Sequence, residues 1–139
     1  MNREVVSEAA VSHHALEEAA LRERRELARR EKLYRGNRPR YVLKGRTAIL
    51  VDDGLATGTT MRAAVRAVKK LKPRRIIIAV PIASPDVCEA FRSEVDAIVC
   101  AQTRAPFYSV GQWYENFEPT TDEEVHALLE ASRKNSKAA

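Results

Sequence analysis

Apolar and polar positions divide the chain into a helical beginning, a middle of short apolar runs and a helical end. Residues 12 to 34 predict one long helix, because Ser12 is a good N-cap and Gly36 follows the end. Residues 1 to 11 either continue this helix or precede it as a separate turn. The apolar stripe of the helix is thin and interrupted by charge, and consists of Leu16, Ala20, Leu27 and Tyr34.

Beyond residue 46, apolar runs alternate with helical stretches. The pattern predicts, in chain order, a strand at 47–51, a helix at 62–71, a strand at 75–82, a helix opened by Ser84 and Pro85, and a strand at 96–101. Nearly continuous apolar strands in a β-α-β-α-β order are typical of a parallel sheet. The predicted fold class is therefore α/β, a parallel sheet with helices on both faces.

The end of the chain predicts one more helix, which starts at a capping box from Thr121 to Glu124 and runs to about Ser132. A length of 139 residues fits a single domain. We expect that domain to contain a mostly helical segment, residues 1–40, and an α/β core, residues 46–133.

The formal net charge of +5 suits a polyanionic ligand or a nucleic acid. Basic residues crowd the stretch from 22 to 46, which also holds Glu23, Glu26 and Glu31. This mixture favours a solvated helix face with i,i+4 ion pairs. A phosphate or nucleic-acid contact is the alternative.

Cysteine and histidine positions indicate neither a metal site nor a secreted protein. Cys88 and Cys100 match no metal spacing, so we expect reduced cysteines in a cytoplasmic protein. No signal peptide and no membrane-length apolar run is present in the sequence. His13, His14 and His126 share no metal spacing and are interpreted as solvated.

The candidate chemistry lies between the strand at 47–51 and the helix that follows. Asp52 and Asp53 stand at the strand's carboxyl end, where ligands of open α/β sheets collect. Gly54 and Gly58 let the next loop approach a ligand closely. The loop amides and the helix dipole favour a phosphate, whereas the carboxylates suit a diol or, through water, Mg²⁺. Together these preferences describe a ribose 5-phosphate unit.

The run ILVDDGLATGTT, residues 49–60, resembles the phosphoribosyl-diphosphate (PRPP) binding signature of type I phosphoribosyltransferases. It lacks the glycine spacing of the P-loop and of the dinucleotide fingerprint. The resemblance implies a Rossmann-like fold in which Asp52 and Asp53 are the catalytic residues. They would hold the ribose hydroxyls and, through water, a nearby Mg²⁺. The residues implied to bind the 5-phosphate are Ala56, Thr57, Gly58, Thr59 and Thr60.

The resemblance also implies a reaction, in which a nitrogenous acceptor displaces pyrophosphate at the anomeric carbon of PRPP. Ala56 stands where enzymes of 6-oxopurine salvage carry an aspartate, which argues against a hypoxanthine–guanine enzyme. The segments RERRELARREKLYRG, VPIASPD and PFYSVGQWYENFEPTTDEEV are similar to uncharacterised bacterial phosphoribosyltransferase-domain proteins. The acceptor base is not specified by any of these segments.

Five of the eight aromatic residues lie between 105 and 117, after the last predicted strand. By resemblance this stretch borders the nucleobase, and the candidates to stack on it are Phe107, Tyr108, Trp113 and Tyr114. The alternative is that these aromatics close the core at the edge of the sheet.

Members of the similar group usually have an upstream half with a pyrophosphate-binding loop, often containing Arg-Gly-Gly. No such loop precedes residue 48, so the fold is expected to be truncated at its N-terminal side. The chain is then a fragment, a short form completed by another subunit, or a protein that binds without catalysis. A sheet without strands on one side exposes an edge, which predicts a homo-oligomer. Two other hypotheses are a non-catalytic PRPP or nucleotide sensor and a nucleic-acid binder using residues 22 to 46.

Overall fold

The computed structural model describes residues 12–36, 38–39 and 41–137, with side chains described as far as residue 132. These residues form two units. Residues 40–118 make up a sheet unit, and the segments up to residue 39 and from residue 119 make up a helical unit. The helical unit contains both the first and the last of the described helices.

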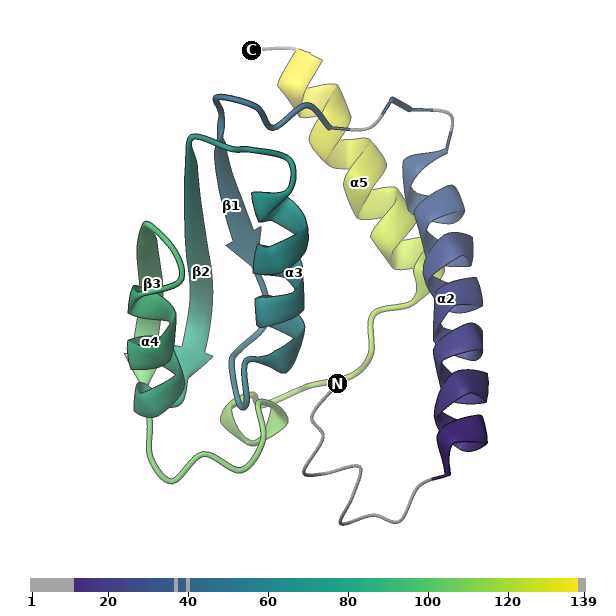
Figure 1. Cartoon of the computed structure of the whole chain (residues 1–139). Coiled ribbons are helices and arrows are strands. Elements are labelled where there is room, and N and C mark those ends of the chain that lie inside the picture. Colours follow the sequence, from purple (N-terminus) through teal and green to yellow (C-terminus); the bar gives the residue numbers. More distant parts are fainter. Residues whose placement is uncertain (1–11, 37, 40, 138–139) are drawn as a thin grey trace. The chain divides into compact units, whose positions relative to one another are not determined.

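The sheet unit contains three parallel strands in the order β1-β2-β3 (Figure 1). Its elements are β1 (Thr47–Val51), α3 (Thr59–Lys69), β2 (Arg75–Ala83), α4 (Pro85–Arg92), β3 (Ala97–Thr103) and a 3₁₀ turn, η1 (Gly111–Trp113). The predicted strands and helices of this region are confirmed. Helix α3 begins three residues before the predicted start, because Gly58 rather than Met61 ends the preceding loop.

Both connecting helices lie on one face of the sheet (Figure 1). Right-handed crossovers between strands taken in consecutive order place α3 and α4 on the same side. The core forms between these helices and that face, and includes Leu55, Met61, Val65, Ile78 and Phe91. Helices were predicted on both faces of the sheet, but within residues 40–118 they cover only one face.

The opposite face of the sheet presents apolar side chains. Ile49 is 61%, Val51 74% and Val99 58% exposed. These residues alternate with buried neighbours, such as Ala48 and Ile78, that point toward the helices. Strand β1 pairs with β2 along one edge, and no described strand pairs with its other edge.

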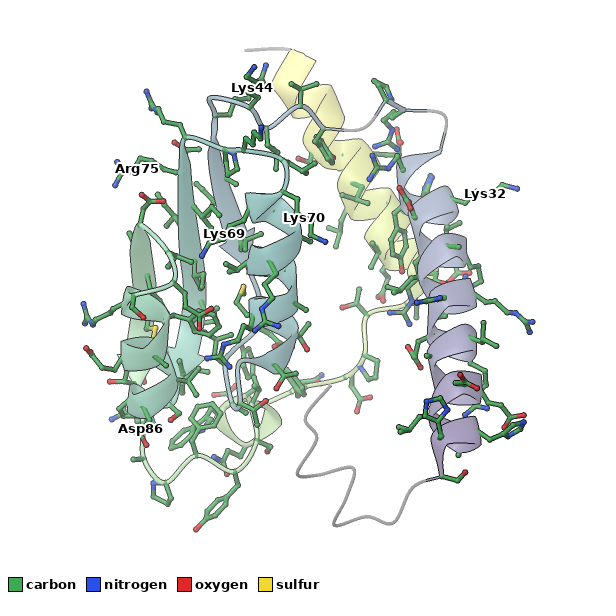
Figure 2. The ribbon with its side chains drawn as sticks, viewed as in Figure 1. Lys32, Lys44, Lys69, Lys70, Arg75 and Asp86 are labelled. Carbon is green, nitrogen blue, oxygen red and sulfur yellow. A yellow bond between two sulfur atoms is a disulfide. The ribbon has the colours of Figure 1, made fainter. Side chains whose placement is uncertain are left out.

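The labelled charged side chains of the sheet unit lie at different ends of it (Figure 2). Lys44 and Arg75 lie at the end where the strands begin, whereas Asp86 lies at the end where they finish. Lys69 and Lys70 lie at the carboxyl end of α3. None of these four labelled cations lies at the carboxyl edge of the sheet, so an anion bound there must find other positive partners.

The expectation that the two cysteines are reduced is wrong. The structure joins Cys88 of α4 and Cys100 of β3 in a disulfide. The two cysteines are 12 residues apart in the sequence, and the β2-α4-β3 crossover brings them into contact between the helix and the strand. Cys88 belongs to the buried core and Cys100 packs against it, so both side chains point into the same apolar layer.

The helical unit consists of α2 (His13–Arg35) and α5 (Asp122–Lys137). The Ser12 hydroxyl accepts the N–H of Ala15 (3.2 Å), and Gly36 follows the last turn, as predicted. The predicted capping box at α5 is also confirmed, since the Glu124 N–H donates to the Thr121 hydroxyl and the Thr121 N–H to the Glu124 carboxylate. No residue of α2 is buried, which agrees with its thin apolar stripe.

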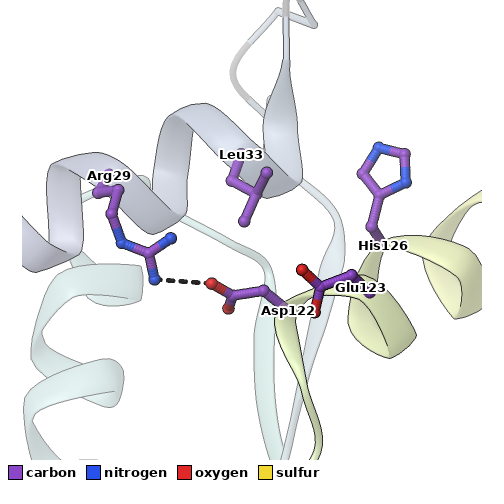
Figure 3. A pocket seen from close by; sticks show the side chains of 5 residues that line it. All are labelled: Arg29, Leu33, Asp122, Glu123 and His126. Carbon is purple, nitrogen blue, oxygen red and sulfur yellow. Dashed lines mark ion pairs between the residues drawn. The ribbon is translucent and has the colours of Figure 1, made fainter.

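Ion pairs occupy much of the basic stretch in this unit. Arg29 contacts Asp122 at 2.8 Å (Figure 3). Arg29 also contacts Glu26 at 2.8 Å, and Arg30 contacts Glu26 at 2.7 Å. The Tyr34 hydroxyl donates to the same Asp122 carboxylate. These pairs support the interpretation of a mixed-charge helix face. In the part of the chain that is described, no helix is long and apolar enough to cross a membrane.

Candidate functional site

The carboxyl end of β1 places Asp52 and Asp53 at the edge of the sheet. The chain leaves β1 after Val51 and is anchored again at Leu55. The Leu55 N–H donates to the Ile82 carbonyl (3.0 Å), and the Leu55 carbonyl accepts from the Ser84 N–H (3.1 Å). The two aspartates therefore lie on a short loop whose two ends, Val51 and Leu55, are held by the sheet.

Gly58 ends the loop and starts α3. Its φ of 70° is left-handed, a conformation that favours glycine. A Cβ atom at this position would lie 2.7 Å from the ring of Phe91 and 2.9 Å from Val87. Helix α4 therefore packs directly against the loop, and only a residue without a side chain fits between them.

The N-cap residue of α3 provides no side-chain cap. This residue, Gly58, makes no side-chain hydrogen bond, and the first turn of the helix holds no acidic residue. The helices α4 and α5 differ, since α4 carries Asp86 and α5 carries Asp122 in the first turn. Uncapped N–H groups and the helix dipole make the start of α3 suitable for an anion.

Threonine hydroxyls stand beside these amides. The Thr57 and Thr59 hydroxyls lie 3.1 Å apart, and the Thr59 N–H donates to the Thr57 hydroxyl at 3.4 Å. This contact keeps two hydroxyl groups together on the exposed side of the loop. A phosphate at the end of α3 would find hydroxyl donors as well as amides.

A cavity of about 280 Å³ joins the loop, the aspartates and the start of α3. This volume is near the lower end of small-molecule sites, roughly 300 Å³, so it suits a compact ligand. Ala56 and Thr57 belong to the same loop but do not line the cavity. Its lining residues are Asp52, Asp53, Gly54, Leu55, Gly58, Thr59, Thr60, Met61 and Val110.

The two neighbouring carboxylates affect each other. Partial burial, and then the negative charge of Asp52, raise the pKa of the Asp53 carboxyl, while hydrogen bonds from the backbone N–H groups of Gly54 and Asp53 oppose the rise. The Asp52 carboxylate accepts the N–H of Asp53 at 3.1 Å. A cation or a hydroxyl donor in the cavity would relieve the repulsion between these groups.

The residues predicted to stack on a base lie apart from this cavity. Phe107 and Trp113 contact each other, with ring centroids 6.1 Å apart, and Trp113 is 39% exposed. Tyr108 is 82% exposed. None of the three lines the cavity, and none is buried in the core.

Two other residues of this segment reach the loop that carries Asp52 and Asp53, here called the aspartate loop. Val110 carried no prediction, and Tyr114 was a candidate to stack on the base. Val110 lines the cavity and lies so near Gly54 that a Cβ there would be 2.7 Å from its Cγ1 atom. The hydroxyl of Tyr114 donates to the carbonyl oxygen of Asp53 at 2.6 Å. The dense aromatic segment was the available signal, but sequence spacing alone does not say which of its residues turns inward.

A larger hollow, about 520 Å³, lies in the helical unit (Figure 3). It is lined by Arg29, Leu33, Asp122, Glu123 and His126. Arg29 and Asp122 are already paired with each other, so the strongest charges in it satisfy one another. No group of three or more histidine, cysteine or acidic residues suited to a metal occurs among the described residues.

The fold and the loop define a class of protein. The family model described as the phosphoribosyl transferase domain matches residues 6–105. The chain belongs to this family, and the predicted resemblance and the Rossmann-like α/β fold are confirmed.

Particular relatives agree with this assignment. Two Mycobacterium tuberculosis proteins, from strains CDC 1551 and H37Rv, are each 36% identical over 135 residues, which is 97% of this chain and 30% of theirs. Both are named as phosphoribosyl transferases of inferred activity. The crystal structure of TT1426 from Thermus thermophilus is 40% identical, with a TM-score of 0.71. The match covers 86% of this chain and 57% of TT1426, so the chain spans only part of the length of these relatives.

Proposed function

We propose that the cavity binds the ribose 5-phosphate portion of PRPP and that the domain serves transfer of the phosphoribosyl group to a nitrogenous acceptor. The observation that carries the proposal is the amino end of α3, which has a glycine N-cap and no acidic residue in its first turn and shares one cavity with Asp52 and Asp53. Phosphate would lie against the amides and hydroxyls from Ala56 to Thr60. The ribose hydroxyls would donate to the two carboxylates.

We infer that Mg²⁺ assists binding. Asp52 and Asp53 are adjacent, and partial burial followed by the charge of Asp52 raises the pKa of Asp53. Such a pair fits a hard divalent cation, which is held in proteins by one or two carboxylates, water and substrate oxygens. Asp52 and Asp53 are the residues that would hold it. When bound, the ion would neutralise charge on the pyrophosphate group.

In the proposed reaction, the bond between the anomeric carbon and pyrophosphate breaks and a carbon–nitrogen bond forms. Pyrophosphate leaves with the bonding electrons, and the acceptor nitrogen loses its proton. The transition state carries positive charge on the ribose, which the neighbouring carboxylates stabilise. The loop amides contribute mainly by holding the phosphate in place.

Other parts of the site belong to the same proposal. Phe107, Tyr108 and Trp113 remain candidates to contact the acceptor base, and Tyr108 and Trp113 are exposed enough for their rings to be accessible. We also propose that the chain forms a homo-oligomer. The apolar uncovered face of the sheet and the open edge of β1 support this.

Calorimetric titration with PRPP, with ribose 5-phosphate and with each in the presence of Mg²⁺ tests the proposed function. Binding of ribose 5-phosphate, strengthened for PRPP by Mg²⁺, is the expected result. If PRPP binds no more tightly than ribose 5-phosphate, the result favours a non-catalytic sensor over a transferase. If neither compound binds, the proposal fails.

A further inference from the structure

The segment from residue 104 to 118, here called the aromatic loop, touches the aspartate loop at two points. The Tyr114 hydroxyl donates to the Asp53 carbonyl (2.6 Å), and Val110 lies against Gly54. The Tyr114 ring is itself held by Phe117, whose ring centroid lies 5.1 Å away. The hydroxyl is therefore presented to Asp53 by a packed side chain.

This contact acts on one peptide plane. The carbonyl of Asp53 and the N–H of Gly54 belong to the same rigid peptide group, so holding the oxygen also fixes the direction of the N–H. The same peptide restricts rotation about the backbone of Asp53, from which the carboxylate side chain extends. Holding its oxygen therefore helps to fix the direction in which that side chain leaves the loop toward the cavity.

We propose that Tyr114 is a positioning residue, whose hydroxyl fixes the Asp53–Gly54 peptide so that the Asp53 carboxylate is held ready for the sugar. This inference rests on the proposed function of the cavity. It adds a residue that acts through Asp53 and does not itself line the cavity.

The hydroxyl is not needed to close the aspartate loop. Leu55 is 2% exposed and is bound on both sides by backbone hydrogen bonds to the end of β2 and the start of α4. The strand before the aspartates is paired with β2 along its length. The contact made by Tyr114 therefore orients one peptide within a loop whose ends are already fixed.

The test compares Tyr114→Phe with the unaltered chain and with Tyr34→Phe. Both variants lose only a hydroxyl that donates to an aspartate, to the Asp53 carbonyl in one and to the Asp122 carboxylate in the other. Each protein is titrated with ribose 5-phosphate by calorimetry and with inorganic phosphate by ³¹P NMR. We expect Tyr114→Phe to bind ribose 5-phosphate about tenfold more weakly, with inorganic phosphate binding unchanged and Tyr34→Phe like the unaltered chain.

The outcomes separate this inference from the function on which it rests. Equal affinity of Tyr114→Phe and the unaltered chain for ribose 5-phosphate overturns the positioning role while the proposed function stands. Equal losses for both ligands also overturn it, because they indicate a general change in the loop. Failure of the unaltered chain to bind ribose 5-phosphate removes the proposed function first, and the inference with it.

Discussion

At the scale of single residues, glycines and aspartates decide the shape and chemistry of the loop. Gly58 combines a left-handed backbone with close contact to α4, so it carries two separate constraints. Asp53 is held in a position that disfavours its own charge. Positions where a sequence accepts such costs are often functional sites.

Gly58→Ala should destabilise the fold more than a left-handed backbone alone explains. Gly45 is a matched control, because its φ is 73° and a Cβ there would meet nothing within 4 Å. We expect Gly45→Ala to cost about 1 kcal/mol. Gly58→Ala should cost about 1–3 kcal/mol more, because its Cβ would overlap Phe91 and Val87. Urea unfolding of the two variants measures the difference, and equal losses would contradict the proposed packing.

Asp53→Asn should change binding and stability in opposite directions. The raised pKa means that the ionised carboxyl costs stability at neutral pH, so its removal should leave stability unchanged or increase it. Affinity for ribose 5-phosphate should fall at least about tenfold, because a charged acceptor is lost. Thermal unfolding and calorimetry report the two effects. A variant that binds as well as the unaltered chain would exclude the role proposed for Asp53.

At the scale of elements, helix ends and side-chain networks distinguish the two units. Helix α3 has no side-chain cap from its N-cap residue and no acidic residue in its first turn, whereas α5 starts with a complete capping box. The helix that has its own cap needs no ligand there. In the helical unit, the charged groups serve the contact between α2 and α5, through Arg29 and Asp122.

The stability of the helical unit should depend on acidic pH through Glu26. Hydrogen bonds from Arg29 and then Arg30 lower the pKa of Glu26 from 4.5 to about 2. The contribution of this carboxylate is therefore complete above pH 4.5 and is lost as the pH falls toward 2. At pH 7, Glu26→Gln should unfold at a lower temperature than the unaltered chain. The difference between the two unfolding temperatures should disappear by about pH 2.

The control for that experiment is Glu23→Gln, which removes the same charge from α2 outside this network. Its unfolding should follow that of the unaltered chain across the range. High salt should narrow the gap caused by Glu26→Gln, because exposed ion pairs are screened. A gap that persists at low pH would show that Glu26 acts through packing instead of charge.

At the scale of the whole molecule, one face of the sheet and one edge of β1 have no cover from residues 40–118. Ile49, Val51 and Val99 form an apolar surface there, and unpaired strand edges readily accept other chains. The match covers 57% of the solved relative TT1426, so that protein contains residues beyond the matched part.

Self-association should therefore depend on this face. We expect the chain to sediment as an oligomer at high protein concentration. The double variant Val51→Lys with Val99→Lys should sediment as a monomer, because two charges would be buried in the interface. Lys70→Glu, at the end of α3 on the covered side of the sheet, changes charge without touching this face. An unaltered chain that stays monomeric at high concentration would refute the homo-oligomer.

The amino-acid sequence by itself determined the element order, the parallel α/β class and the position of the loop from Asp52 to Thr60, between β1 and α3. Local signals were enough for these, since a buried strand, two aspartates and a small-residue loop occupy consecutive positions. It also identified the family, through a motif that is continuous in the chain. The helix caps at Ser12 and Thr121 could be predicted equally well, because each joins residues only three positions apart.

Only the tertiary structure decided which distant residues meet. The Cys88–Cys100 disulfide, the helices gathered on one face, and the contact from Tyr114 to Asp53 all depend on crossovers and loop paths. Hydrophobic periodicity says that a side chain is buried but not which partner buries it, because many partners offer the same apolar surface. The aromatic segment shows this most clearly, since the family resemblance predicted that it borders the nucleobase, whereas packing brings Val110 and Tyr114 to the aspartate loop.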